Sequence, residues 1–258
     1  AINGNLTATN LNLQSSASVN INGNLTATSA FTTETTTTIK NVGTITFPSA
    51  QLNINNTFTN NGSLTSVAGP IKDVEVTGTF VLNTYLNLSS LTVKPRGNLT
   101  HSANSATQSA IINITAVNLT IEAGGEINVT GKGFSGSTGP GKGGDRGDCC
   151  SAGGGGGYGG GGSRGTNVGG VSGSPYGSIT LPLELGSGGG LGTSSGASGG
   201  GTVFLNVTGT LNVTGKITAA GSRAGADAYG GGGGSGGSIY VTDSNFVGTG
   251  IINASGGE

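Results

Sequence analysis

A short repeat near the start of the chain limits the fold more than any other feature. The octapeptide Ile-Asn-Gly-Asn-Leu-Thr-Ala-Thr occupies Ile2–Thr9 and recurs at Ile21–Thr28, a shift of 19 residues. A looser form, Gly followed by a small polar residue and then Leu, Ile or Phe, occurs at Gly4, Gly23, Gly43, Gly62, Gly78 and Gly97, with spacings of 19, 20, 19, 16 and 19. A nearly fixed period of this length is typical of a chain built by stacking one structural unit.

The residues between these glycines predict short strands. Apolar and polar residues alternate over three to five positions, as at Leu11/Leu13 and Val74/Val76, and no stretch has helical spacing. We therefore predict an all-β fold, a right-handed parallel β-solenoid (β-helix) of about 20-residue coils that bury a continuous core by stacking. The alternative is a β-sandwich in which the Asn-Gly pairs at Gly4, Gly23 and Gly62 form hairpin turns.

Glycine content divides the chain into three parts within one continuous domain. Residues 1–130 contain 9 of the 55 glycines and residues 131–201 contain 31. We predict β-solenoid coils over 1–130, a glycine-rich insertion over 131–201 and returning solenoid strands over 202–258. Such a composition is also typical of disorder. The tyrosines Tyr158 and Tyr176, and a glycine run that leads directly into the strand-like Val203–Val207, favour an ordered and closely layered segment.

Several glycine-rich blocks follow one another in a characteristic order between about Gly125 and Thr242. They are Gly153–Gly160, Ser174–Ser178, Leu185–Gly190, Leu211–Ile217 and Gly234–Tyr240. These blocks resemble the glycine-rich parallel β-solenoid modules of secreted microbial surface proteins. The resemblance implies an extracellular, cell-surface protein of a kind that often has no assigned activity. This chain is shorter and carries adjacent cysteines, which makes it similar in kind to subunits of archaeal sheaths and other covalently reinforced surface tubes.

The adjacent cysteines Cys149 and Cys150 are the most informative reactive groups. They could be buried thiols, a strained vicinal disulfide, links to other subunits or half of a metal site. A closed zinc site needs four Cys or His ligands, and His101 is the one other candidate in the sequence. Consecutive Cα atoms lie about 3.8 Å apart, which is short for a disulfide. We predict intersubunit disulfides, with the vicinal disulfide as the alternative.

Twelve Asn-x-Ser/Thr sequons are candidates for N-glycosylation in a secreted chain. They begin at Asn5, Asn24, Asn55, Asn61, Asn87, Asn98, Asn113, Asn118, Asn128, Asn206, Asn212 and Asn253. A strand that points Asn and Thr outward produces the same motif without any modification, because positions i and i+2 share a face.

Charge and catalytic residues are scarce. Ten basic and eleven acidic residues give a formal net charge of −1, which argues against a nucleic-acid binder. No apolar run is long enough to insert into a membrane.

Gly131–Gly136 resembles a dinucleotide fingerprint and Gly136–Lys142 a phosphate loop, but more glycine follows instead of a helix. Asp73 and Glu75, near Lys72, could suit glycoside chemistry, with a solvated salt-bridge patch as the alternative. We predict no enzymatic activity, no cofactor and no metal site.

The function predicted from these features is structural. We expect a secreted subunit that starts at Ala1 after removal of a leader and polymerises through unpaired strand edges into a surface filament, tube or sheath. Its main partner would be itself, with glycans or other cell-envelope proteins as further partners. The alternative is an extracellular adhesin or carbohydrate-binding module that uses the outer Asn/Thr faces or the tyrosines. A polysaccharide-cleaving enzyme on the same scaffold would need a cluster of acids and bases that the sequence does not provide.

Overall fold

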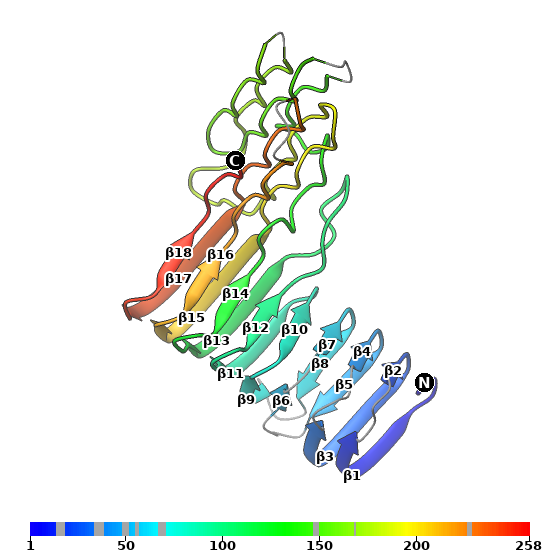
Figure 1. Cartoon of the computed structure of the whole chain (residues 1–258). Coiled ribbons are helices and arrows are strands. Elements are labelled where there is room, and N and C mark those ends of the chain that lie inside the picture. The colour runs from blue at the N-terminus through cyan, green and yellow to red at the C-terminus, as the bar shows by residue number, and fades with distance from the viewer. Residues whose placement is uncertain are drawn as a thin grey trace.

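The computed structural model describes residues 1–13, 19–33, 39–47, 52–54, 57–66, 71–146, 150–167, 169–225 and 229–258. In these residues the strands form two parallel sheets, and no helix is present (Figure 1). The prediction of an all-β fold is confirmed, because short alternating segments rich in Leu, Ile, Val and Thr form strands.

Ten strands form one sheet and eight form the other. The ten-stranded sheet contains β1 (Leu6–Leu13), β3 (Asn24–Thr33), β5 (Thr44–Phe47), β6 (Leu52–Ile54), β8 (Ser63–Ser66), β9 (Ile71–Val76), β11 (Leu86–Val93), β13 (Ile112–Ile121), β15 (Thr202–Val213) and β17 (Ser238–Val247). The eight-stranded sheet contains β2 (Val19–Ile21), β4 (Ile39–Asn41), β7 (Thr57–Asn60), β10 (Thr79–Leu82), β12 (Asn98–Thr100), β14 (Glu126–Asn128), β16 (Lys216–Thr218) and β18 (Ile251–Asn253).

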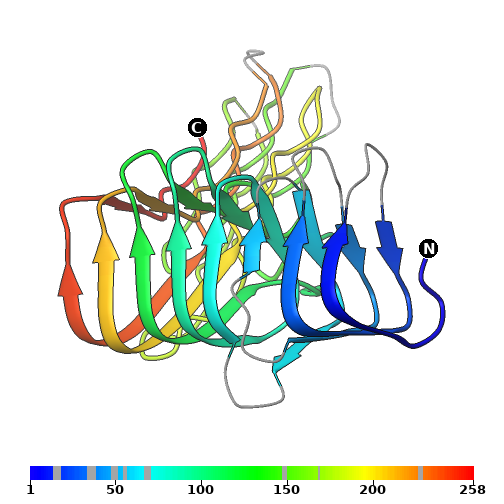
Figure 2. The same cartoon turned by 90° about the horizontal axis from the view of Figure 1, so that it is seen from below.

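The chain passes back and forth between the two sheets. From β9 onward it alternates strictly, so that β11, β13, β15 and β17 lie in one sheet and β12, β14, β16 and β18 in the other. Figure 2 shows one sheet in front of the other, with their strands in the same order. All strand pairs among the described residues are parallel. The hairpin alternative is therefore wrong, because an Asn-Gly hairpin joins antiparallel neighbours.

One continuous apolar core lies between the sheets. It is built from rows of residues that are in register on successive strands, so each side chain packs on its equivalent in the next strand. A row of the eight-stranded sheet has every side chain buried and runs through Ile39, Phe58, Phe80, Leu99, Ile127 and Ile217. The rings of Phe58 and Phe80 stack with centroids 5.4 Å apart.

The glycines of the repeat fall into two columns instead of one. Gly23, Gly43 and Gly62 lie where the chain leaves the eight-stranded sheet, and a Cβ on Gly62 would stand 2.0 Å from the carbonyl oxygen of Gly43. Gly97 lies at the opposite turn, between β11 and β12, where a Cβ would stand 2.0 Å from the Val76 oxygen. The irregular spacing of 16 residues marks the change from one turn to the other.

The glycine-rich segments form a layered region beside the sheets (Figure 1). Residues 153–157 illustrate its hydrogen bonding: successive N–H groups donate to three different segments, and the pattern returns to the same segment after three residues. The N–H groups of Gly153 and Gly156 donate to Gly230 and Gly233, those of Gly154 and Gly157 donate to Gly144 and Gly141, and that of Gly155 donates to Ser163. A period of three is that of a polyproline-II helix, whose N–H groups are free to bond with neighbours.

This region agrees with the prediction of closely layered glycines. A Cβ on Gly232 would stand 1.9 Å from the Gly154 oxygen, and a Cβ on Gly190 2.0 Å from the Gly144 oxygen. Residues 219–225, 229–237 and 254–258 also contribute, since Ser222 donates to Ser198 and Gly257 to Gly234. The layered region is therefore assembled from segments beyond the predicted insertion of 131–201.

Candidate functional site

Both sheets end in strands that have a neighbour on one side. Within the described residues β17 pairs with β15 alone and β18 with β16 alone; we call these two strands the C-terminal edge. At the other end β1 pairs with β3 alone, and Ile2 forms a single bridge to Ile21; we call this the N-terminal edge. An edge strand presents backbone N–H and C=O groups that can pair with another strand.

Apolar side chains at these edges are more exposed than their equivalents inside. Phe246 of β17 is 51% exposed, whereas Leu211, its register partner on β15, is 0% exposed. Ile252 of β18 is 47% exposed, and its partner Ile217 is 0% exposed. At the N-terminal edge Leu6 is 38% exposed and its partner Leu25 is 0% exposed. Each edge thus has side chains in core rows that no further strand covers.

An aromatic stack on the outer face of the ten-stranded sheet also ends at the C-terminal edge. Phe204 of β15 and Tyr240 of β17 are in register, with ring centroids 5.5 Å apart and an interplanar angle of 9°. Parallel rings in adjacent strands stack along the direction in which strands add. Tyr240 is the last ring of the stack, because β17 is the last strand of its sheet.

One carboxylate interrupts the apolar rows of the C-terminal edge. Asp243 of β17 is in register with Val207 of β15, which is buried, so the Asp243 side chain occupies a core-facing position. Asp243 is exposed, and among the described residues its carboxylate makes no hydrogen bond or ion pair. Inward-pointing charges on edge strands are a known means of preventing uncontrolled pairing.

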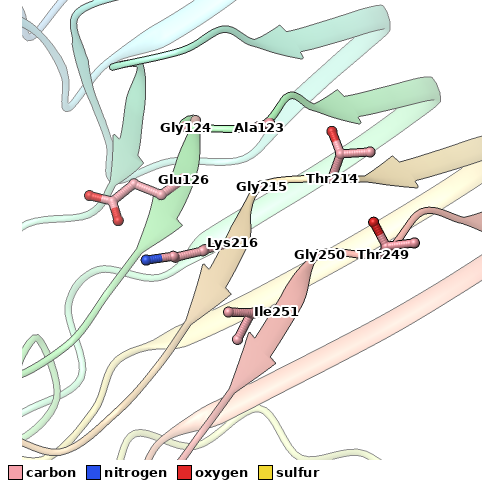
Figure 3. A pocket seen from close by; sticks show the side chains of 10 residues that line it. Ala123, Gly124, Glu126, Thr214, Gly215, Lys216, Thr249, Gly250 and Ile251 are labelled. Carbon is pink, nitrogen blue, oxygen red and sulfur yellow. The ribbon is translucent and has the colours of Figure 1, made fainter.

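A shallow pocket of about 250 Å³ lies at the turns beside this edge (Figure 3). Glu126 and Lys216 line it from β14 and β16 and are in register, and the turn at Thr249 and Gly250 closes one side. Glu126 accepts a hydrogen bond from Asn128 at 3.3 Å. The pocket brings together one carboxylate, one ammonium group and threonine hydroxyls, without a nucleophile paired to a base.

A second pocket, of about 360 Å³, lies in the glycine-rich region. Tyr158 and Tyr176 form its aromatic wall in an edge-to-face contact with centroids 5.0 Å apart, and Ile179 on its rim is fully exposed. The hydroxyl groups of both rings are anchored, since Tyr158 bonds to Ser238 at 2.5 Å and Tyr176 to Ser187 at 2.9 Å. Burial raises the pKa of Tyr158 and raises that of Tyr176 to about 12.

The predicted cysteine site is described in part. Cys149 lies outside the described residues, so its partner stays a prediction. Cys150 is exposed, and its carbonyl oxygen accepts a hydrogen bond from the Asn167 side chain at 2.9 Å. An exposed position is accessible to a second subunit.

The sequons differ in accessibility. Exposed positions are Asn5, Asn24, Asn61, Asn87, Asn118 and Asn253; half-buried positions are Asn98, Asn113, Asn128, Asn206 and Asn212. Asn55 lies outside the described residues. The side-chain oxygens of Asn98 and Asn113 are buried without a hydrogen-bond partner, so these two sites are poor acceptors for a glycan.

Of the two acidic residues considered for catalysis, Glu75 takes part in a surface ion pair. Glu75 lies 3.7 Å from the Lys94 ammonium, which also binds Glu122 at 2.9 Å. The hydrogen bond to Glu122 raises the pKa of Lys94. Asp73 is exposed on the same strand, so the salt-bridge interpretation of this patch is the better one. No group of three or more metal-binding side chains lies close together in the part of the chain described.

His101 is buried, and both of its ring nitrogens bond to backbone groups. Its Nδ1–H donates to the Ser102 carbonyl at 2.7 Å, and Nε2 accepts the N–H of Thr202 at 3.3 Å. Burial lowers the pKa of His101 to about 4, so the ring is neutral at pH 7. This residue holds the start of β15 and faces no nucleophile.

Comparison with protein-family models, with curated proteins and with solved structures gave no match in any of the three. Among the described residues no helix could cross a membrane by its length and apolar character. The two sheet edges and the tyrosine pocket are therefore the features on which a functional proposal can rest. Sequence reasoning anticipated unpaired edges but missed Asp243, whose core-facing position follows once the alternation of Ile239 and Val241 is continued by one step.

Proposed function

We propose that this chain is a secreted structural subunit that assembles into a filament, tube or sheath at a cell surface. The proposal includes a right-handed parallel β-solenoid as the fold of the subunit. Two observations support this fold: the chain alternates between two parallel sheets, and residues one repeat apart, such as Leu6 and Leu25, are in register. A stack of equivalent coils can be continued by another copy.

The observation that carries the proposal is the pair of uncovered edges. Phe246 and Ile252 at one end, and Leu6 at the other, are exposed, whereas their register partners Leu211, Ile217 and Leu25 are fully buried. All strands run parallel, so the two edges of a chain differ and an added copy would join head to tail. A head-to-tail contact without closing rotation produces an open filament.

Other features are compatible with a covalently reinforced surface assembly. Cys149 and Cys150 would form disulfides between neighbouring subunits, and the exposure of Cys150 favours this role. The exposed sequons, such as Asn5 and Asn87, would carry glycans on a secreted protein. The proposal includes no catalytic role and no cofactor.

The proposal is tested by assembly of the full chain. Negative-stain microscopy and sedimentation velocity would compare the wild type with Phe246→Asp and with Val117→Asp. Val117 is 46% exposed on β13, a strand inside the sheet. Val117→Asp is therefore the control: it also replaces an exposed apolar side chain by aspartate, but at a position away from the edge. We expect filaments for the wild type and for Val117→Asp and none for Phe246→Asp. A wild type that stays monomeric at high concentration, whatever the pH, would overturn the proposal.

Mixing two edge variants tests the head-to-tail geometry. Leu6→Asp disables the N-terminal edge and Phe246→Asp the C-terminal edge, so neither variant can join to itself. Their mixture retains one functional contact and should form dimers, with no longer species. Filaments in the mixture, or dimers of either variant alone, would contradict a head-to-tail contact.

The tyrosine pocket favours one second candidate, an adhesin that binds carbohydrate. Tyr158 and Tyr176 present fixed aromatic rings beside Ser178 and the exposed Ile179, and sugars bind to combinations of aromatic faces and hydroxyl groups. A glycan array with wild type and Tyr176→Ala would separate the two functions. Loss of glycan binding without loss of assembly would assign the pocket to adhesion.

A further inference from the structure

The core-facing residues of β17 and β1 have the same spacing. On β17 they are Val241, Asp243 and Phe246, and on β1 they include Leu6 and Ala8; position 11 of β1, three residues further along, is in register with position 31. In the pairs β15–β17 and β1–β3 the register shifts after the second of these positions, because β15 and β3 each have one residue more there. Two of the inner strands have this spacing as well, since β11 has Leu86, Leu88 and Leu91 and β13 has Ile114, Ala116 and Leu119.

From this match we infer that the occupant of the C-terminal edge is the N-terminal edge of a second copy, and that Asp243 controls its addition. The inference rests on the proposed function and adds a register and a regulating residue. In this register Leu6 of the incoming copy lies over Val241, Ala8 over Asp243, and position 11 over Phe246. The apolar row of Val241 then continues through Leu6 of the next subunit, and Asp243 interrupts the neighbouring row.

Addition of a copy would bury the Asp243 carboxylate. Neither β15, which pairs with β17, nor β18, the edge strand of the other sheet, contains a charged residue, and neither does the incoming β1. Lys216 on β16 is in register with Glu126, and both belong to the polar row that alternates with the buried Ile127 and Ile217. Ala8 offers no polar group to the carboxylate. An unpaired buried charge is strongly unfavourable, so the neutral form of Asp243 is the one compatible with assembly.

Two changes should therefore promote assembly: protonation of Asp243 and its replacement by asparagine. At about pH 7.5 we expect the critical concentration of Asp243→Asn to be at least about tenfold below that of the wild type. Asp73→Asn is the matched control, because Asp73 is exposed on β9 and in register with Ser90, away from both edges. Lowering the pH to about 5 should lower the critical concentration of the wild type and leave that of Asp243→Asn nearly unchanged.

The register has its own test. Ala8→Lys would place a lysine over Asp243, on adjacent strands about 5 Å apart, and should lower the critical concentration at neutral pH. The same lysine combined with Asp243→Asn should give no such gain. Thr7→Lys, which is in register with Thr26 on the other face, is the control and should not assist assembly.

The outcomes separate the two levels of the proposal. If wild type and Asp243→Asn assemble equally at both pH values, the control by Asp243 is overturned and the filament stands. If Thr7→Lys lowers the critical concentration as much as Ala8→Lys, the register is overturned. If no form assembles under any of these conditions, the proposed function itself fails.

Discussion

The buried His101 predicts a specific loss of stability in acid. Its ring is 0% exposed, donates from Nδ1 to the Ser102 carbonyl and accepts the Thr202 N–H at Nε2. Protonation would convert Nε2 from an acceptor into a donor that faces another donor. The ring cannot move away into space beside Gly201, where even a Cβ would stand 2.3 Å from Nε2.

The magnitude follows from the two pKa values of His101. The pKa is about 4 in the folded chain and 6.5 for the unperturbed side chain, with burial as the main cause of the shift. Above pH 6.5 both states are neutral and the group has no effect on stability. Between pH 6.5 and 4 the unfolded state binds the proton preferentially, so the free energy of unfolding falls as pH falls. The loss reaches about 3 kcal/mol at pH 4.

The assay is chemical denaturation of wild type and His101→Gln between about pH 7.5 and 4. Glutamine removes the titrating group, and other acidic groups contribute equally to both proteins, so the difference between the two curves isolates His101. We expect that difference to change by about 3 kcal/mol in favour of the variant as the pH falls. A pH-independent difference would refute the assignment of a neutral, buried imidazole.

Two further predictions concern the glycine layers and the cysteines. Gly232→Ala would place a Cβ 1.9 Å from the Gly154 oxygen and should lower the free energy of unfolding by about 2 kcal/mol or more. In Gly160→Ala the added Cβ meets no atom within 4 Å, so this control variant should be nearly as stable as the wild type in thermal denaturation. Equal effects of the two substitutions would contradict the close packing. Assembled wild type should retain covalent multimers in detergent without thiol, and Cys149→Ser/Cys150→Ser should not; multimers that persist in the double variant would exclude the intersubunit disulfide.

The repeat predicted the β-strands and the parallel stacking because both depend on local pattern. Alternation such as Val74/Val76 places one face toward the core, and a 19-residue step returns the chain to the same register. The two glycine columns were not predicted. At both turns, at Gly62 and at Gly97, a carbonyl oxygen lies where a Cβ would be, so both turns require glycine and look alike in the sequence. The sequence therefore shows one series of glycines, with the spacing of 16 as its largest irregularity.

The layered glycine region and the tyrosine pocket depend on distant partners that no local pattern identifies. Gly153 donates to Gly230, and Tyr158 bonds to Ser238, so both contacts join segments about 80 residues apart. Glycine has no side chain whose polarity would reveal which neighbour each N–H selects. The sequence predicted close layering from composition but could not predict the three-residue period.

The scarcity of charge and the abundance of glycine follow from the same requirement, close contact between backbones. In the layered region a single Cβ on Gly232 would displace a neighbouring segment, and in the sheets the core rows are apolar except where the buried Asn41 and Asn60 bond to each other. Within such rows one carboxylate at an open edge has a large effect, because the next layer would remove it from water. Asp243 occupies that position, so the free energy of its burial would decide when the apolar rows of one subunit continue into the next.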